Sequence, residues 1–170
     1  METTALVIID MQNSFTTSKD TTTTKNVLIQ IKKAKKDNVP ILVLEYVGHG
    51  ETKFKIKRSL KKYEKVYYVK KVNDNGSVEL MLCVCKHKIN VQRFIVCGVN
   101  ISFCVAGTTS GLVEKYKKRI TVIKNACNCD GSKNNGDRDL AFNGQGYTKI
   151  YQHQNVTLVW FSRVVIFLSY

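Results

Sequence analysis

The chain has 170 residues, of which 44% are hydrophobic and 24% charged, an ordinary globular composition that we expect to form a single domain over residues 1–170. Lys and Arg outnumber Asp and Glu by 27 to 13, a net charge of +14, which attracts anions of many kinds but names no function by itself. No stretch approaches the roughly 20 apolar residues of a membrane helix, so we exclude a membrane-spanning protein.

Short apolar runs alternate with helical patterns along the chain, an order typical of βαβ units and a parallel sheet. The runs are too short and too evenly apolar for amphipathic helices, and they predict parallel strands buried on both faces. They lie at residues 4–9, 40–46, 66–71, 93–98, 120–124 and 156–161. Because ligands bind at the carboxyl edge of open α/β sheets, reactive side chains at strand ends are candidates for a site.

The first run, in ALVIIDMQNSF, places Asp10 at a strand end. Together with Glu2 it surrounds a short apolar stretch that lacks the basic, apolar, small-residue order of a signal peptide. We therefore expect a cytoplasmic protein. The Thr-rich segment 16–25 has no periodicity and predicts a loop.

The first helix is predicted from about Asn26 to Asp37, with Val27, Ile31 and Ala34 on one face. Amphipathicity alone explains its opposite, solvated face, which carries Lys32, Lys33, Lys35 and Lys36. Since no basic and aromatic residues interleave as in RNA-stacking motifs, nucleic acid is not the expected partner.

A second clear helix start lies at Ser77, an N-cap residue that follows the turn formers of the NDNG tract. Its predicted core face consists of Val78, Met81, Leu82 and Cys85. The helix after Cys104 is expected to bury Val105, Leu112 and Tyr116, and segment 128–139, rich in Asn, Gly and Asp, predicts a loop.

Cys104 follows the run FIVCGVNISFCVAGT and lies near the first turn of the next helix. Amide donors and the positive helix end there are expected to favour the thiolate. Asp10 could act as a base beside it, and Lys70 or Lys71 at the end of another strand could balance the charge. The alternative is that Cys104 is a small buried core residue.

The six cysteines are expected to be reduced thiols, since the chain shows no secretory signal. Two C-x-C pairs, Cys83 with Cys85 and Cys127 with Cys129, do not match the C-x2-4-C spacing that zinc sites favour. We therefore predict no metal site from the cysteines.

Three segments together resemble the isochorismatase-like cysteine hydrolases, which include nicotinamidases and carbamoyl amidohydrolases. They are DMQNSF, the strand-terminal lysine followed by NDNGS, and VCGVNISFCVAGT followed by ITVIKNAC, over about residues 4–160. The resemblance implies a three-layer, doubly wound α/β fold. Its mostly parallel six-stranded sheet has the order 3-2-1-4-5-6, with helices on both faces.

The resemblance also implies a catalytic triad of Asp10, Lys71 and Cys104, with Lys70 as the alternative lysine. Adjacent strand residues point to opposite faces, so only one lysine can reach the site, and the family frame favours Lys71. A non-proline cis peptide is implied near Val99 and Asn100, with backbone amides of that turn and of Cys104 forming an oxyanion hole.

Two tracts depart from the family pattern. Residues 73–77 (NDNGS) replace the small and aromatic residues that often line the substrate pocket. EYVGHGE replaces the D-x-H arrangement of the metal-containing nicotinamidases, so Glu45 and His49 are interpreted as a solvated turn. We expect no metal and no other cofactor.

The sequence therefore predicts a hydrolase that cleaves a small-molecule amide or ureido C–N bond through a Cys104 thioester. An alternative is a catalytically silent domain that acts in binding or assembly through its basic surface. A vinyl-ether hydrolase like isochorismatase is a third possibility, but those enzymes lack this cysteine. The apolar tail Val164–Leu168 and the resemblance both favour a homo-oligomer.

Overall fold

The computed structural model describes residues 3–129, 141–142 and 146–160. Its centre is a sheet of six strands in the order β3-β2-β1-β4-β5-β6, and every neighbouring pair is parallel. The strands are β1 (Thr4–Ile9), β2 (Ile41–Tyr46), β3 (Val66–Lys71), β4 (Arg93–Val99), β5 (Arg119–Asn128) and β6 (Val156–Val159). The predicted strands and their order are confirmed, although β5 continues to Asn128, beyond the predicted end at residue 124.

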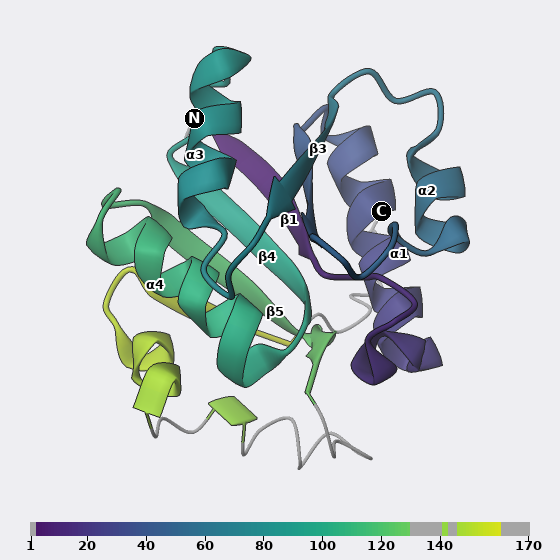
Figure 1. Cartoon of the computed structure of the whole chain (residues 1–170). Coiled ribbons are helices and arrows are strands. Elements are labelled where there is room, and N and C mark those ends of the chain that lie inside the picture. The colour runs from purple at the N-terminus through teal and green to yellow at the C-terminus, as the bar shows by residue number, and fades with distance from the viewer. Residues whose placement is uncertain (1–2, 130–140, 143–145, 161–170) are drawn as a thin grey trace, which may run out of the picture.

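Helices cover both faces of this sheet, so the predicted three-layer, doubly wound architecture is also confirmed (Figure 1). The helices α1 (Thr21–Lys36) and α2 (Phe54–Leu60) lie on one face, and α3 (Ser77–Lys86) and α4 (Ala106–Glu114) lie on the other. Among the described residues, the fold also contains the 3-10 helices η1 (Thr16–Lys19) and η3 (Gly146–Gln152), and the π-helical turn η2 (Ile101–Val105).

Strand β1 shows how the two cores form. Leu6 and Ile8 pack into the core beneath α1 and α2, whereas Val7 and Ile9 pack into the core beneath α3 and α4. Because successive strand residues point to opposite faces, a strand between two helical layers must be apolar at every position. This is why the buried strands are continuous apolar runs.

Helix α1 begins five residues earlier than the sequence predicts, so the expectation of a loop over 16–25 is wrong. Asp20 is the N-cap, and its carboxylate accepts a 2.6 Å hydrogen bond from the Thr23 amide. Thr24 Oγ1 donates to the Asp20 carbonyl at 3.0 Å. These local bonds compensate for the low intrinsic helix propensity of a run of threonines.

The predicted core face of α3 is mostly wrong as well, since only Met81 of its four residues packs against the core. Leu80 and Val84 are buried, whereas Val78, Leu82 and Cys85 are exposed. Nearly every position from 78 to 85 is apolar, so periodicity alone could not select a face. Close packing at the helix start selects it, because Gly76 lies against Leu44 and Lys71.

The prediction for α4 is better: Val105 and Leu112 are buried, and Tyr116 is partly buried. Within the residues that the structure describes, no helix has both the length and the apolar character needed to cross a bilayer. Cytoplasmic location stays a prediction. Most of the predicted loop 128–139 and the tail Val164–Leu168 lie outside the described residues. The tail was one argument for a homo-oligomer, so the structure does not test that prediction.

Gly98 is a position where the fold requires glycine. Its φ is +134°, and a Cβ there would overlap the backbone oxygen and nitrogen of Ile9 in the neighbouring strand. Gly48 also has a positive φ, of +85°, but a Cβ there would meet open space. Comparing alanine substitutions at the two positions therefore distinguishes the cost of left-handed backbone from the cost of steric overlap.

We expect Gly98→Ala to destabilise the protein by more than about 4 kcal/mol, because strands β1 and β4 would have to separate. Gly48→Ala should lose only about 1–2 kcal/mol, the cost of left-handed backbone. Urea unfolding would measure both free energies. Similar losses at the two positions would contradict the predicted contact between Gly98 and β1.

Candidate active site

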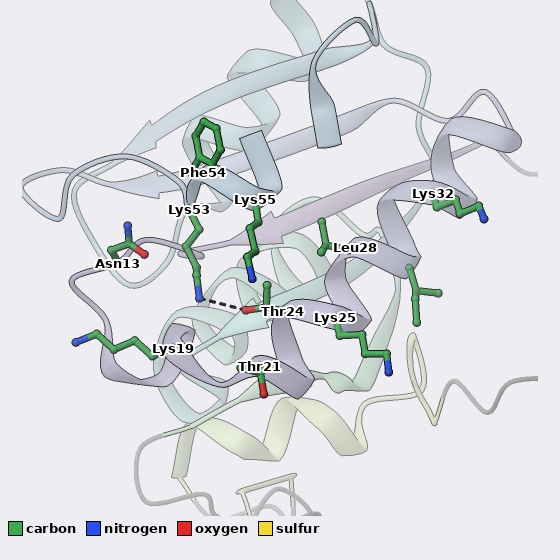
Figure 2. Close-up of a pocket in the computed structure, with 11 residues that line it drawn as sticks. Asn13, Lys19, Thr21, Thr24, Lys25, Leu28, Lys32, Lys53, Phe54 and Lys55 are labelled. Carbon is green, nitrogen blue, oxygen red and sulfur yellow. Dashed lines mark hydrogen bonds between the residues drawn. The ribbon is translucent and has the colours of Figure 1, made fainter. Parts of the chain in front are cut away.

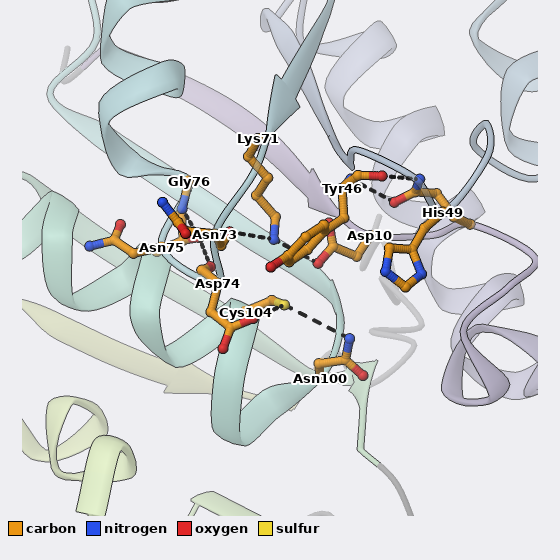
Figure 3. A network of polar contacts seen from close by, with 12 residues as sticks. Asp10, Tyr46, His49, Lys71, Asn73, Asp74, Asn75, Gly76, Asn100 and Cys104 are labelled. Atoms are coloured by element: carbon orange, nitrogen blue, oxygen red, sulfur yellow. Dashed lines mark hydrogen bonds and ion pairs between the residues drawn. The ribbon is translucent and has the colours of Figure 1, made fainter.

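A fully buried ion pair lies at the carboxyl edge of the sheet. Asp10 is the first residue after β1, and Lys71 is the last residue of β3; Lys71 Nζ lies 3.0 Å from Asp10 Oδ2 (Figure 3). Strand β2 lies between β1 and β3, so the lysine stem must cross about two strand spacings of roughly 4.8 Å each. The length of a lysine side chain makes this contact possible.

Lys70 and Lys71 point in different directions, as strand alternation requires. Lys70 Nζ donates to Glu45 Oε2 at 2.6 Å and is largely exposed, whereas Lys71 has no exposed side-chain surface. Of the two lysines considered from the sequence, Lys71 is therefore the one that contacts Asp10.

Protein groups enclose the Lys71 ammonium. Besides the ion pair, Nζ donates to the Asn73 carbonyl at 3.0 Å and lies 4.1 Å from the centre of the Tyr46 ring. Such a cation–π contact is favourable when the cation is desolvated. These contacts hold the ammonium close to the Asp10 carboxylate.

Asp10 keeps capacity to accept a proton. Neither carboxylate oxygen accepts a well-aligned hydrogen bond from the described residues, although both are buried. Burial raises the pKa of the Asp10 carboxyl, and the Lys71 ammonium is the largest opposing influence, followed by the nearby Cys104 thiol. A buried carboxylate with a free lone pair and a raised pKa has the properties of a general base.

Cys104 lies within the π-helical turn η2, between β4 and α4, and is 2% exposed. Its Sγ donates to Asp74 Oδ1 at 3.4 Å, and Asn100 Nδ2 lies 3.9 Å from the sulfur. Thr17 Oγ1 donates to Asn100 Oδ1 at 3.1 Å, which fixes the amide orientation. The turn after β4 therefore presents the thiol toward two carboxylates, Asp10 and Asp74.

The expectation that the helix start favours a resting thiolate is wrong. Burial raises the pKa of the Cys104 thiol well above its ordinary value, and the Asp10 and Asp74 carboxylates raise it further, while Lys71 opposes them. At neutral pH the sulfur is therefore protonated. Any nucleophilic reaction of Cys104 requires a base that removes its proton.

The expected cis peptide near Val99 and Asn100 is not found, since the described chain contains no cis peptide bond. The turn is made instead by positive φ values, +134° at Gly98 and +66° at Asn100. Rotation about φ reverses the chain without a change at the peptide bond. An oxyanion hole at this turn stays a prediction.

The sequence did not identify three residues that shape the site: Gln12, Tyr46 and Asp74. Gln12 Nε2 donates to the Tyr46 carbonyl at 2.9 Å, and its Oε1 accepts from the Tyr46 amide at 2.8 Å. This pair of bonds holds the Tyr46 ring over Lys71. Asp74 lies three residues after Lys71 in the tract 73–77, which the sequence marks as a turn and as a departure from the family's pocket pattern, without a role for Asp74 itself.

The expected solvated turn is wrong for Glu45, which belongs to β2, whereas His49 does lie in the turn after β2 and is partly exposed. Glu45 is buried and accepts from Thr52 and Lys70, and the ring of His49 stacks on Phe15 with 4.3 Å between ring centres. In the part of the chain that the structure describes, no three His, Cys, Asp or Glu side chains cluster in a way that could hold a metal ion. A site without a metal stays a prediction.

The family model for the isochorismatase domain matches residues 4–144, and the chain belongs to this family of the isochorismatase-like hydrolase superfamily. A search of curated proteins found no match.

Several solved structures share the fold. The MAR1 ribonuclease from Caenorhabditis elegans has a TM-score of 0.73 and 22% identity, over 93% of this chain and 76% of that one. The nicotinamidase SaPncA from Staphylococcus aureus has a TM-score of 0.72 and 14% identity, over 94% of this chain and 100% of that one. The N-carbamoylsarcosine amidase from Thermoplasma acidophilum has a TM-score of 0.69 and 16% identity, over 93% and 96%.

Replacing Lys71 by Met keeps the apolar stem but leaves Asp10 without its charge partner. We expect a loss of about 3–5 kcal/mol in unfolding free energy near neutral pH. The loss should shrink in acid, because a protonated Asp10 needs no cation. Lys70→Met should cost clearly less, because Lys70 is largely exposed and the buried Glu45 carboxylate keeps its two hydrogen bonds from Thr52. Urea unfolding at several pH values would test this, and equal losses for the two variants would contradict it.

Asp10→Asn and Asp74→Asn should each lower the pKa of the Cys104 thiol, because each removes a negative charge that disfavours the thiolate. A fall of one unit would raise the rate of alkylation by iodoacetamide about tenfold at pH 8. Mass spectrometry of the labelled peptide would measure that rate. Asp37→Asn, an exposed position at the end of α1, is the matched control. Unchanged rates in both site variants would place the carboxylates too far from the sulfur.

Proposed function

We propose that the chain is a cysteine hydrolase that cleaves an amide or ureido C–N bond of a small molecule through a thioester on Cys104. One observation carries the proposal: the Cys104 thiol lies near Asp10, a buried carboxylate with free acceptor capacity that is paired with Lys71. This is the arrangement of nucleophile, base and charge partner that covalent catalysis needs.

In the first half of the reaction Asp10 takes the thiol proton while Sγ attacks the substrate carbonyl carbon. The tetrahedral intermediate then collapses, the C–N bond breaks, and Asp10 returns the proton to the leaving nitrogen as ammonia or an amine departs. Backbone amides near Asn100 and Cys104 are proposed to stabilise the oxyanion, an effect typically worth about 10² to 10³ in rate.

In the second half a water molecule replaces the leaving group. Asp10 takes a proton from this water as its oxygen attacks the thioester carbonyl, and the C–S bond breaks to release the acid. The proton passes from Asp10 to the sulfur, which restores the thiol. Lys71 stabilises the Asp10 carboxylate each time it re-forms. The scheme uses only groups of this chain and water, so it calls for no cofactor.

The comparisons support the C–N substrate class without identifying the substrate. Two of the neighbours are a nicotinamidase and an N-carbamoylsarcosine amidase, names that denote cleavage of amide or carbamoyl nitrogen. Their identities of 14% and 16% show a shared fold alone. Because the D-x-H arrangement is absent from this chain, we do not propose nicotinamide as its substrate.

A catalytically silent binding or assembly domain is the second candidate. The Asp74 carboxylate against the thiol and the net charge of +14 favour it. The intact group of Asp10, Lys71 and Cys104 favours the enzyme, since a binding domain has no need to bury an ion pair beside a thiol.

We further propose a single cytoplasmic domain that assembles as a homo-oligomer.

Ammonia release from a panel of small amides and ureas would test the function. We expect activity that falls about 10⁴-fold or more in Asp10→Asn and in Cys104→Ala, because members of one catalytic unit fail together. The double variant should be little worse than either single one. Cys85→Ala, at an exposed thiol, should keep full activity. Independent, multiplicative losses would show that Asp10 and Cys104 do not act as one unit.

A further inference from the structure

A groove of about 750 Å³ lies between α1 and the start of α2, away from Asp10, Lys71 and Cys104 (Figure 2). Its polar lining is strongly basic. Five lysines from three segments of the chain line it: Lys19, Lys25, Lys32, Lys53 and Lys55. Leu28 and Ile29 of α1 supply an apolar part of the wall.

The charge of this groove is not balanced by carboxylates. No Asp or Glu is among the described residues that line it, and none of its five lysines forms an ion pair with a described residue. The lysines also repel one another: burial lowers the pKa of Lys53, and the charges of Lys55 and Lys19 lower it further, against the opposing influence of Asp20. An anionic ligand would relieve this repulsion.

One cation is held in place before any ligand arrives. Lys53 Nζ donates to the Ser18 carbonyl at 2.6 Å and to Thr24 Oγ1 at 3.2 Å, and the Lys53 amide donates to the Met11 carbonyl at 2.8 Å. Figure 2 shows Lys53 and Lys55 reaching toward α1, along which Lys25 and Lys32 are placed. Lys25 and Lys32 lie seven residues apart, or about 10.5 Å along the helix, so the cations form a row.

The groove also offers an aromatic surface. Phe54 lies between Lys53 and Lys55 in sequence and is 73% exposed. A large aromatic side chain next to a row of cations is the combination that binds single-stranded nucleic acid, where phosphates follow the charges and a base stacks on the ring. A ligand with phosphate groups alone would make no use of Phe54.

We propose that this groove binds a segment of single-stranded nucleic acid, with phosphates on the lysines and one base stacked on Phe54. The sequence did not favour this partner, because the only interleaved basic and aromatic residues in the groove are the short run Lys53–Lys55. The remaining cations come from η1 and α1, and only the fold brings them beside Phe54.

The test measures binding of a fluorescein-labelled uridine 12-mer by anisotropy between 50 and 200 mM salt. The triple variant Lys25→Gln, Lys32→Gln, Lys55→Gln should bind at least about tenfold more weakly at low salt. Its slope of log affinity against log salt should be smaller by about 2, or roughly 0.7 for each lost phosphate contact. A control triple at the exposed Lys36, Lys86 and Lys115 has the same net charge of +11, three below +14, and should bind like the wild type.

Phe54→Leu separates nucleic acid from other polyanions. It should weaken binding of the 12-mer about tenfold, the typical order of one base–aromatic stack, and leave binding of inorganic polyphosphate unchanged. Equal losses of affinity for the 12-mer in the two triple variants would show that overall charge alone explains binding, which would overturn the proposal. So would an unaffected Phe54→Leu variant, or wild-type binding of polyphosphate without the 12-mer.

Thermal unfolding would confirm that each variant is folded, as expected for exposed positions. The groove triple variant should keep wild-type ammonia release, since none of its residues belongs to the proposed catalytic group. The binding result therefore stands or fails independently of the proposed hydrolase activity.

Discussion

The buried ion pair between Asp10 and Lys71 is the constraint on which the rest of the site depends. Each charge alone would be costly to bury, so the two strand ends must arrive together, with β2 between them. Removing one partner leaves an uncompensated buried charge and strongly destabilises the folded protein. Replacing both by apolar residues is often neutral in other proteins. The proposed reaction would give this pair a role that stability alone does not supply.

The same pair determines how Cys104 can react. A buried thiol that faces carboxylates stays protonated, so its reactivity must come from transfer of the proton during attack. Asp74 strengthens this effect from the tract in which the chain departs from its family pattern. In the proposed reaction, proton transfer is therefore coupled to attack, and Asp10 serves both halves.

Charge is distributed unevenly in this basic protein. At the candidate active site two carboxylates, Asp10 and Asp74, lie near the Cys104 thiol, whereas the groove between α1 and α2 collects five lysines without a carboxylate among its described lining residues. The segment η1 borders both regions, since Thr17 bonds Asn100 and Lys19 lines the groove. The overall net charge therefore describes neither site.

The sequence by itself determined the strands, and with them the placement of Asp10, Lys71 and Cys104 near strand ends, because strands buried on both faces must be continuously apolar. Alternation along β3 allowed only one of Lys70 and Lys71 to reach the site, and the family frame favoured Lys71. Only the tertiary structure decided the buried face of α3, the protonated state of Cys104, the contact with Asp74 and the basic groove. Each of these depends on side chains from segments distant in sequence. Local patterns carry periodicity and turn chemistry, whereas burial and electrostatic environment exist only after those segments have packed together.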